Sequence, residues 1–100
     1  MNKLSRNEVL SRARDLEGWL IQDDKLVKEY IFNDFKEAIE YVRSIQPVAD
    51  SINHHPDICI HYNRVHVELT THDAGGLTEL DFKLASELDE IKRKSLKELT

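Results

Sequence analysis

The chain has 100 residues, enough for one modest hydrophobic core but not two, so we expect a single domain over residues 1–100. Its 14 basic and 19 acidic residues give a net charge of -5, which argues against a nucleic-acid surface built on phosphate contacts. One cysteine excludes an internal disulfide, and no apolar run is long enough for a membrane span or a signal-peptide core; we therefore expect a cytoplasmic protein without a membrane partner.

The first third of the chain predicts a helix followed by a strand pair. Ser5 and Glu8 have the spacing of a capping box, and the helix that they open should run to about Leu16. Apolar residues then alternate over 19–22 and 25–32, with two aspartates between the runs. This pattern is typical of a β-hairpin.

Two longer helices should follow. Asn33 is the expected cap of the second helix, whose apolar positions recur with a 3.6-residue period. Pro47 interrupts this period, and because apolar residues resume beyond it we expect a kink rather than an end. The third helix should begin at Thr78, with Asp81 as the other half of its cap, and continue towards Leu99.

Between these helices, two alternating runs flank a two-residue Asn-Arg loop and predict a second hairpin. If Tyr62 faces Val65, the apolar residues share one face: Ile58, Ile60, Tyr62, Val65, Val67 and Leu69. The other face then carries Cys59, His61, His66, Glu68 and Thr70. Extending this register sets His55 opposite His72, although Pro56 limits regular pairing there.

Four strands in two hairpins and three helices predict an α+β fold. We expect a four-stranded antiparallel sheet with three α-helices packed on one face.

Five stretches carry a recognisable signature: Gly18-Trp19, Phe32-x-Asp34-Phe35, His54-His55-Pro56, Tyr62-Asn63-x-Val65-x-Val67-x-Leu69-x-Thr71-His72-Asp73 and Gly76-Leu77-Thr78-x-x-Asp81. The pattern resembles that of the pterin-4a-carbinolamine dehydratase family, from about Leu10 to Ile91. Two positions depart from it: Ile58 stands where the family often has an aromatic residue, and Asp50 where a glutamate is usual.

The resemblance implies a hydro-lyase that converts a 4a-hydroxytetrahydropterin to quinonoid dihydropterin and water, in tetrahydropterin recycling. We expect no cofactor or metal, because the reaction requires nothing redox-active or strongly Lewis-acidic. The implied partners are a reduced pterin and further copies of the chain, as a homodimer joined through sheet edges or a homotetramer joined through long helices. From the net charge of -5 we expect no direct nucleic-acid binding.

The resemblance also implies the site. His54, His55 and His72 would line it and provide the acid and base, and the residues forming it would include Asn53, Thr70, Thr71, His72 and Asp73. Histidine suits this chemistry because its ordinary pKa of about 6.5 lets neutral and charged forms coexist near neutral pH. We prefer His54 and His72 as the proton-transfer pair, with His55 orienting the ring.

Two acidic residues are expected to support the site. Asp50, on the last turn of the second helix, could orient His54, whereas Asp81 is expected mainly as a capping carboxylate close to the site. We interpret His61 and His66 as a facing surface pair or as subunit contacts.

Two other functions remain open. The family includes dimerisation cofactors for a transcription factor, so the chain could be a protein-binding module on the same fold. His54, His55 and His72 could instead bind zinc, although adjacent histidines rarely both point at one metal.

Overall fold

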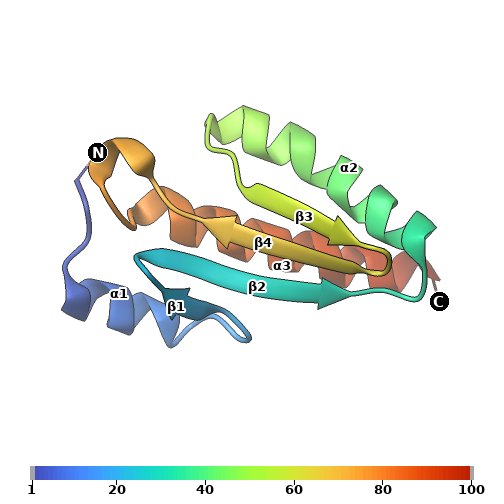
Figure 1. The fold of residues 1–100 in the computed structure, drawn as a ribbon, viewed down its shortest axis with the longest axis horizontal. Coiled ribbons are helices and arrows are strands. Elements are labelled where there is room, and N and C mark those ends of the chain that lie inside the picture. Colours follow the sequence, from blue (N-terminus) through green and yellow to red (C-terminus); the bar gives the residue numbers. More distant parts are fainter. Residues whose placement is uncertain (1, 100) are drawn as a thin grey trace.

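The computed structural model describes the backbone of residues 2–99 and the side chains of residues 2–95. The elements in chain order are α1 (Arg6–Ala13), β1 (Leu20–Gln22), β2 (Lys25–Ile31), α2 (Phe35–Ile52), β3 (Asp57–His61), β4 (Arg64–Leu69), the 3-10 turn η1 (His72–Ala74) and α3 (Glu79–Leu99). The strands form one four-stranded antiparallel sheet in the order β1-β2-β4-β3. In Figure 1, α3 crosses behind the sheet, α2 runs along its β3 side, and α1 lies beside β1. The predicted α+β fold is confirmed.

One core fills the space between the sheet and the helices. Side chains with no exposed surface come from β2, β4, α2 and α3: Leu26, Val65, Val67, Leu69, Ala38, Leu84, Ala85 and Leu88. Tyr41 of α2 is also buried, and its hydroxyl donates to the Leu88 carbonyl of α3 at 3.0 Å. Among the described residues, no helix is both long and apolar enough to cross a membrane.

The capping box that opens α1 is confirmed. The Glu8 amide donates to the Ser5 hydroxyl, and the Ser5 amide donates to the Glu8 carboxylate. The helix ends at Ala13 rather than at Leu16, because the chain tightens there into bonds between residues three apart, including the Leu16 amide to the Ala13 carbonyl. Leu16 still packs against the core.

The cap of α2 differs from our prediction. Asp34, not Asn33, accepts the Glu37 amide, at 2.9 Å, while the Glu37 carboxylate accepts the Asn33 amide. The helix continues through Pro47, as predicted, and ends at Asn53, whose backbone is left-handed with φ 51°. That left-handed residue turns the chain sharply out of the helix.

The register of the second hairpin also differs. Ile60 pairs with Val65 and Ile58 with Val67, so the turn is Tyr62-Asn63 rather than Asn63-Arg64. The slip moves each pairing by two residues, which keeps every strand side chain on its predicted face, and the apolar pattern therefore could not exclude it. Tyr62 leaves the core face and is 65% exposed.

The same slip separates two histidines that we expected to face each other. His61 lies opposite Arg64, and His66 lies opposite Cys59. The His66 ring instead contacts Glu68 at 2.9 Å, on the sheet face away from the core.

A polar cluster joins the first hairpin to α3. The Asp89 carboxylate accepts the Trp19 indole N–H at 3.1 Å, the Lys28 ammonium at 2.7 Å and the Tyr30 hydroxyl at 2.6 Å. Trp19 and Tyr30 are also in edge-to-face contact, with ring centroids 6.3 Å apart. Because these side chains are partly or wholly buried, one carboxylate fixes where the hairpin lies on the helix.

Candidate functional site

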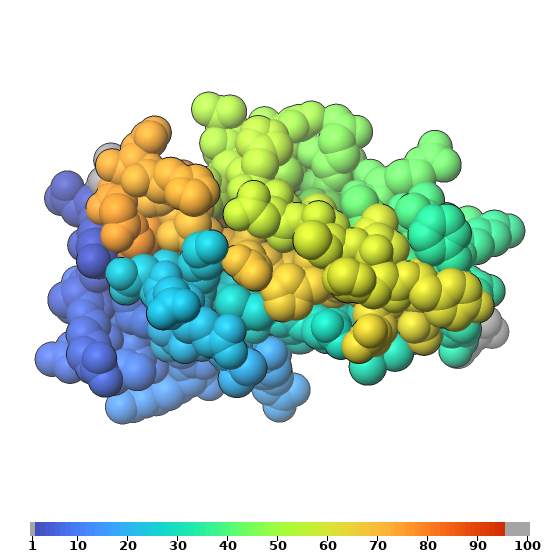
Figure 2. Space-filling view, in the orientation of Figure 1, coloured from blue at the N-terminus to red at the C-terminus, as the bar shows by residue number. Residues whose placement is uncertain are grey.

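The predicted site residues come from two chain segments that meet near the start of α3. After α2 ends, the His54 amide donates to the Ala49 carbonyl, which holds the first segment against the helix. The second segment follows β4, where Thr71 forms an isolated bridge with Gly76 and η1 lies between them. In Figure 2, the orange segment after β4 and the green end of α2 lie on the same side of the molecule.

His54 and Asp81 form the closest pair of this site. The ring Nε2 lies 2.6 Å from the Asp81 Oδ1 atom. The His54 side chain is 11% exposed, and that of Asp81 is fully buried. A buried carboxylate that accepts a ring N–H fixes the orientation of the ring and the tautomer it adopts.

The second oxygen of Asp81 is also fully engaged. Its Oδ2 atom accepts the Thr71 hydroxyl at 2.8 Å and the Thr78 amide at 2.9 Å. The Thr78 hydroxyl in turn accepts the Leu80 amide at 3.3 Å. Asp81 is therefore both the capping carboxylate of α3 that we predicted and the partner of His54.

His55 forms a second, exposed pair with Asp50. The His55 Nε2 atom lies 2.7 Å from the Asp50 Oδ1 atom, and both side chains are more than half exposed. The His55 ring and then the Gln46 side chain amide lower the pKa of the Asp50 carboxyl below its usual value. Our prediction that Asp50 orients His54 is wrong, because the turn at Asn53 directs His54 towards α3 and leaves Asp50 to His55.

The structure does not pair His55 with His72 as we predicted. Regular pairing of β3 with β4 ends at Asp57 and Glu68, before either histidine. His72 is the exposed first residue of η1, and its ring makes no hydrogen bond or ion pair with the described residues. The residue before His72, Thr71, is the one linked to His54. Both Thr71 and His54 contact the Asp81 carboxylate, each at a different oxygen atom.

The other predicted site residues have clear positions. Asn53 is the left-handed cap of α2, and Asp73 is an exposed residue of η1. The Thr70 hydroxyl donates to the Asp24 carbonyl at 3.0 Å, which ties the site to the turn of the first hairpin. Sequence reasoning assigned Thr78 only a capping role; the Thr-x-x-Asp spacing gave no sign of its contact with Thr71.

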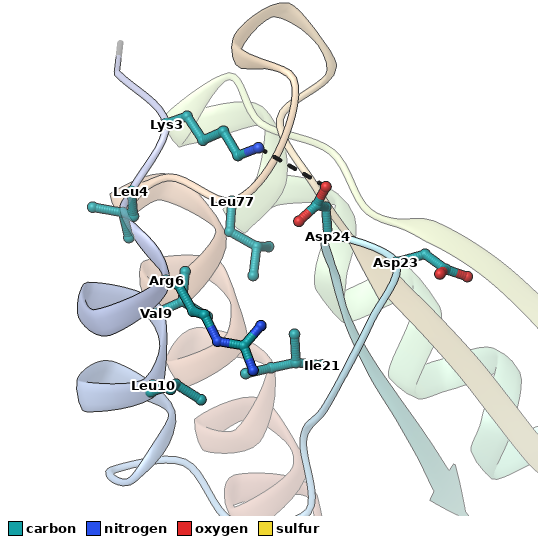
Figure 3. Close-up of a pocket in the computed structure, with 9 residues that line it drawn as sticks. All are labelled: Lys3, Leu4, Arg6, Val9, Leu10, Ile21, Asp23, Asp24 and Leu77. Carbon is teal, nitrogen blue, oxygen red and sulfur yellow. Dashed lines mark ion pairs between the residues drawn. The ribbon is translucent and has the colours of Figure 1, made fainter.

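The described side chains include no group of three or more His, Cys, Asp or Glu arranged to hold a metal ion. A cavity of about 560 Å³ lies apart from the histidines, between α1, the first hairpin and Leu77 (Figure 3). Lys3 and Asp24 form an ion pair across it at 3.9 Å, and both are at least half exposed.

The chain is similar to one protein family over nearly its whole length. The family model described as pterin 4 alpha carbinolamine dehydratase matches residues 2–91. A relative from Sulfurisphaera tokodaii, provisionally named as a pterin-4-alpha-carbinolamine dehydratase, is 48% identical over 91 residues, covering 91% of this chain and 98% of the relative. One from Metallosphaera sedula with the same provisional name is 50% identical over 93 residues, covering 93% and 97%.

Solved structures agree. The transcriptional coactivator/pterin dehydratase of Brucella melitensis superposes with a TM-score of 0.86 at 35% identity, covering 90% of this chain and 98% of that one. A pterin dehydratase-like protein described as a RuBisCO assembly factor in the alpha-carboxysome has a TM-score of 0.61 at 16% identity, covering 73% and 84%, and shares the fold.

Proposed function

Because the chain belongs to the pterin-4a-carbinolamine dehydratase family, we propose that it dehydrates a 4a-hydroxytetrahydropterin to quinonoid dihydropterin and water. The observation that carries the proposal is the His54–Asp81 pair, a nearly buried imidazole held at 2.6 Å by a fully buried carboxylate. Such a pair provides a ring of fixed orientation that can exchange a proton with a substrate.

The reaction moves two protons. An acid protonates the 4a-hydroxyl, the C4a–O bond breaks and water leaves, and a base removes the proton from N5 as the C4a=N5 double bond forms. We assign these two roles to His54 and His72, with His55 orienting the pterin ring. The Thr71 hydroxyl and the Asp81 carboxylate support this grouping, because they join the segment of His72 to the ring of His54.

The first test measures how fast purified protein dehydrates a chemically generated 4a-hydroxytetrahydropterin. We expect His54→Ala and His72→Ala each to lower the rate by roughly 100 to 10,000-fold, the usual contribution of a positioned acid or base. His61→Ala is the matched control, because His61 is an exposed histidine of β3 opposite Arg64 and should leave the rate unchanged. Full activity in either His54→Ala or His72→Ala would contradict the assignment.

A protein-binding role is the second candidate. One relative with a solved structure is named both a transcriptional coactivator and a pterin dehydratase. Absence of dehydration by wild-type protein with an intact fold would favour this role.

We further propose that the protein is a cytoplasmic homodimer or homotetramer. The strands β1 and β3 are the open edges of the sheet, and an unpaired edge favours association. Light scattering measures the mass of the assembly directly.

A further inference from the structure

Two threonine hydroxyls lie beside Asp81, and the proposed mechanism gives neither of them a role in proton transfer. Thr78 is fully buried and Thr71 is partly buried. Their oxygen atoms lie 2.8 Å apart, and the Thr71 hydroxyl also lies 2.8 Å from Asp81 Oδ2. The contacts therefore form one chain from Thr78 through Thr71 to Asp81 and His54.

The direction of each bond in this chain follows from counting hydrogens. An ionised carboxylate only accepts, so the single hydrogen of the Thr71 hydroxyl goes to Asp81. The hydroxyl of Thr78 must then donate to Thr71, and its own oxygen accepts the Leu80 amide. The Thr78 amide supplies a further donor to Asp81. Every donor in the chain points towards the carboxylate.

This arrangement determines which nitrogen of His54 is protonated. The ionised carboxylate has no hydrogen to donate, so Oδ1 accepts from the ring Nε2, which must carry the hydrogen. The two donors on Oδ2 hold the carboxylate where this contact is made, and loss of one of them would let it move away from the ring. The ring Nδ1 makes no hydrogen bond with the described residues, so it is the nitrogen left for substrate. We infer that Thr71 and Thr78 are positioning residues that fix Asp81 and hold His54 in the Nε2–H tautomer, with Nδ1 as the base that accepts the N5 proton.

The inference rests on the proposed function for its kinetic part only. It assigns His54 as the base and leaves His72 as the acid. It also changes the expected role of Thr71 from a residue that binds substrate to one that acts through Asp81.

The test determines the tautomer of His54 from long-range proton–nitrogen-15 spectra, recorded at a pH where the histidine rings are uncharged. A His54→Gln sample assigns the His54 signals by their loss. We expect a single Nε2–H tautomer in wild type. Thr71→Val, which keeps the side-chain shape and removes the hydroxyl, should give a mixture of tautomers and a kcat lower by about tenfold. Thr71→Ser, which restores the hydroxyl, should recover both values.

Ser44→Ala is the control for loss of a hydroxyl, because Ser44 is exposed on α2 and bonds only its own helix, at the Glu40 carbonyl. An Nδ1–H tautomer in wild type overturns the inference, as does a Thr71→Val protein with an unchanged tautomer and kcat. If Thr71→Val does not fold, Thr78→Val, which removes the hydroxyl that donates to Thr71, takes its place with the same two expected results. An inactive wild type that still shows the Nε2–H tautomer would contradict the proposed function and not the positioning.

Discussion

The Asp81 carboxylate serves the fold and the candidate site with different oxygen atoms. Its Oδ2 accepts the Thr78 amide at the start of α3, and its Oδ1 contacts the His54 ring. The sequence predicted the capping role from the Thr-x-x-Asp spacing. The contact with His54 could not be predicted in this way, because it depends on how the turn at Asn53 directs the chain towards α3.

Asp81→Asn should separate the two roles. The amide oxygen can still accept the Thr78 amide, but the amide nitrogen would then face His54 Nε2 and favour the opposite tautomer. We expect a fall in dehydration rate of about 100-fold or more, with a loss of unfolding free energy of about 1–3 kcal/mol. The rate assay and urea unfolding measure the two effects.

Glu79→Gln is the control for this substitution. Glu79 lies on the same turn of α3, but its carboxylate is largely exposed and pairs with Arg12. Loss of the Glu79 charge should leave the dehydration rate unchanged. A normal rate in Asp81→Asn would show instead that the His54–Asp81 contact has no part in dehydration.

The partners of the two adjacent histidines were predicted only in part. The signature identified His54 and His55, and the structure gives each a carboxylate partner. We assigned Asp50 to the wrong one of the two. Adjacent residues in a turn point in different directions, and the sequence does not specify that direction without the backbone angles of Asn53.

At the scale of helices and strands, the elements were predicted well and their ends less so. The cap of α2 shows why: Asn33 and Asp34 are both good capping residues, and only the backbone decides between them. The Glu37 carboxylate contacts Asn33, and the Glu37 amide contacts Asp34. Sequence therefore located the start of the helix to within one residue.

Alanine substitutions should distinguish these neighbours. Asp34→Ala should lower the free energy of unfolding by about 1 kcal/mol, because α2 loses the acceptor for the Glu37 amide. Asn33→Ala should cost less, since the contact of its backbone amide with Glu37 survives. Urea unfolding compares the two, and a larger loss for Asn33→Ala would contradict the observed cap.

The β3–β4 turn holds a residue in an unfavourable conformation. Tyr62 has φ 53° and an exposed side chain, and a left-handed backbone is costly for residues other than glycine, asparagine and aspartate. Tyr62→Asn should raise the free energy of unfolding by about 0.5–1 kcal/mol. Tyr62→Ala removes the ring without relieving the backbone and serves as the comparison; equal stability of the two variants would show that no strain is stored there.

At the scale of the whole molecule, ionisable groups limit stability at both ends of the pH range. His55 and Gln46 lower the pKa of the Asp50 carboxyl, and His66 with Lys25 lowers that of Glu68. A lowered carboxyl pKa stabilises the fold above the unfolded value, 3.8 for Asp50 and 4.5 for Glu68, and this stabilisation is lost as pH falls through the folded value.

The alkaline limit has the opposite sign. Burial raises the pKa of the Tyr30 and Tyr41 hydroxyls above 10.0, so their stabilisation is complete below that pH and is lost above it. Lys92 opposes them, because burial lowers its pKa from 10.5. We expect the urea midpoint to be level near neutral pH and to fall below about pH 4.5 and above about pH 10. A midpoint that stays constant down to pH 3 would contradict the acidic part.

The fold class was predictable because the spacing of apolar residues in each segment matches the period of the strand or helix that forms there. The Val65, Val67 and Leu69 alternation of β4 and the helical period around Ile45 give matching buried faces. The register of β3 was not predictable, since a two-residue slip preserves those faces. The choice depends on tertiary contacts, such as the Asn63 side chain amide donating to the Phe32 carbonyl at 2.9 Å.

The cluster around Asp89 makes the chain its own optical probe. Trp19 is the only tryptophan, and its indole N–H is bound to α3 while its ring touches Tyr30. Its fluorescence therefore reports whether the first hairpin is docked on α3, and transfer of excitation from Tyr30 to Trp19 is most efficient while the two rings stay close. A shift of Trp19 emission to longer wavelength marks release of this hairpin from the middle of α3, and this signal is distinct from the unfolding of the histidine segment at the start of α3.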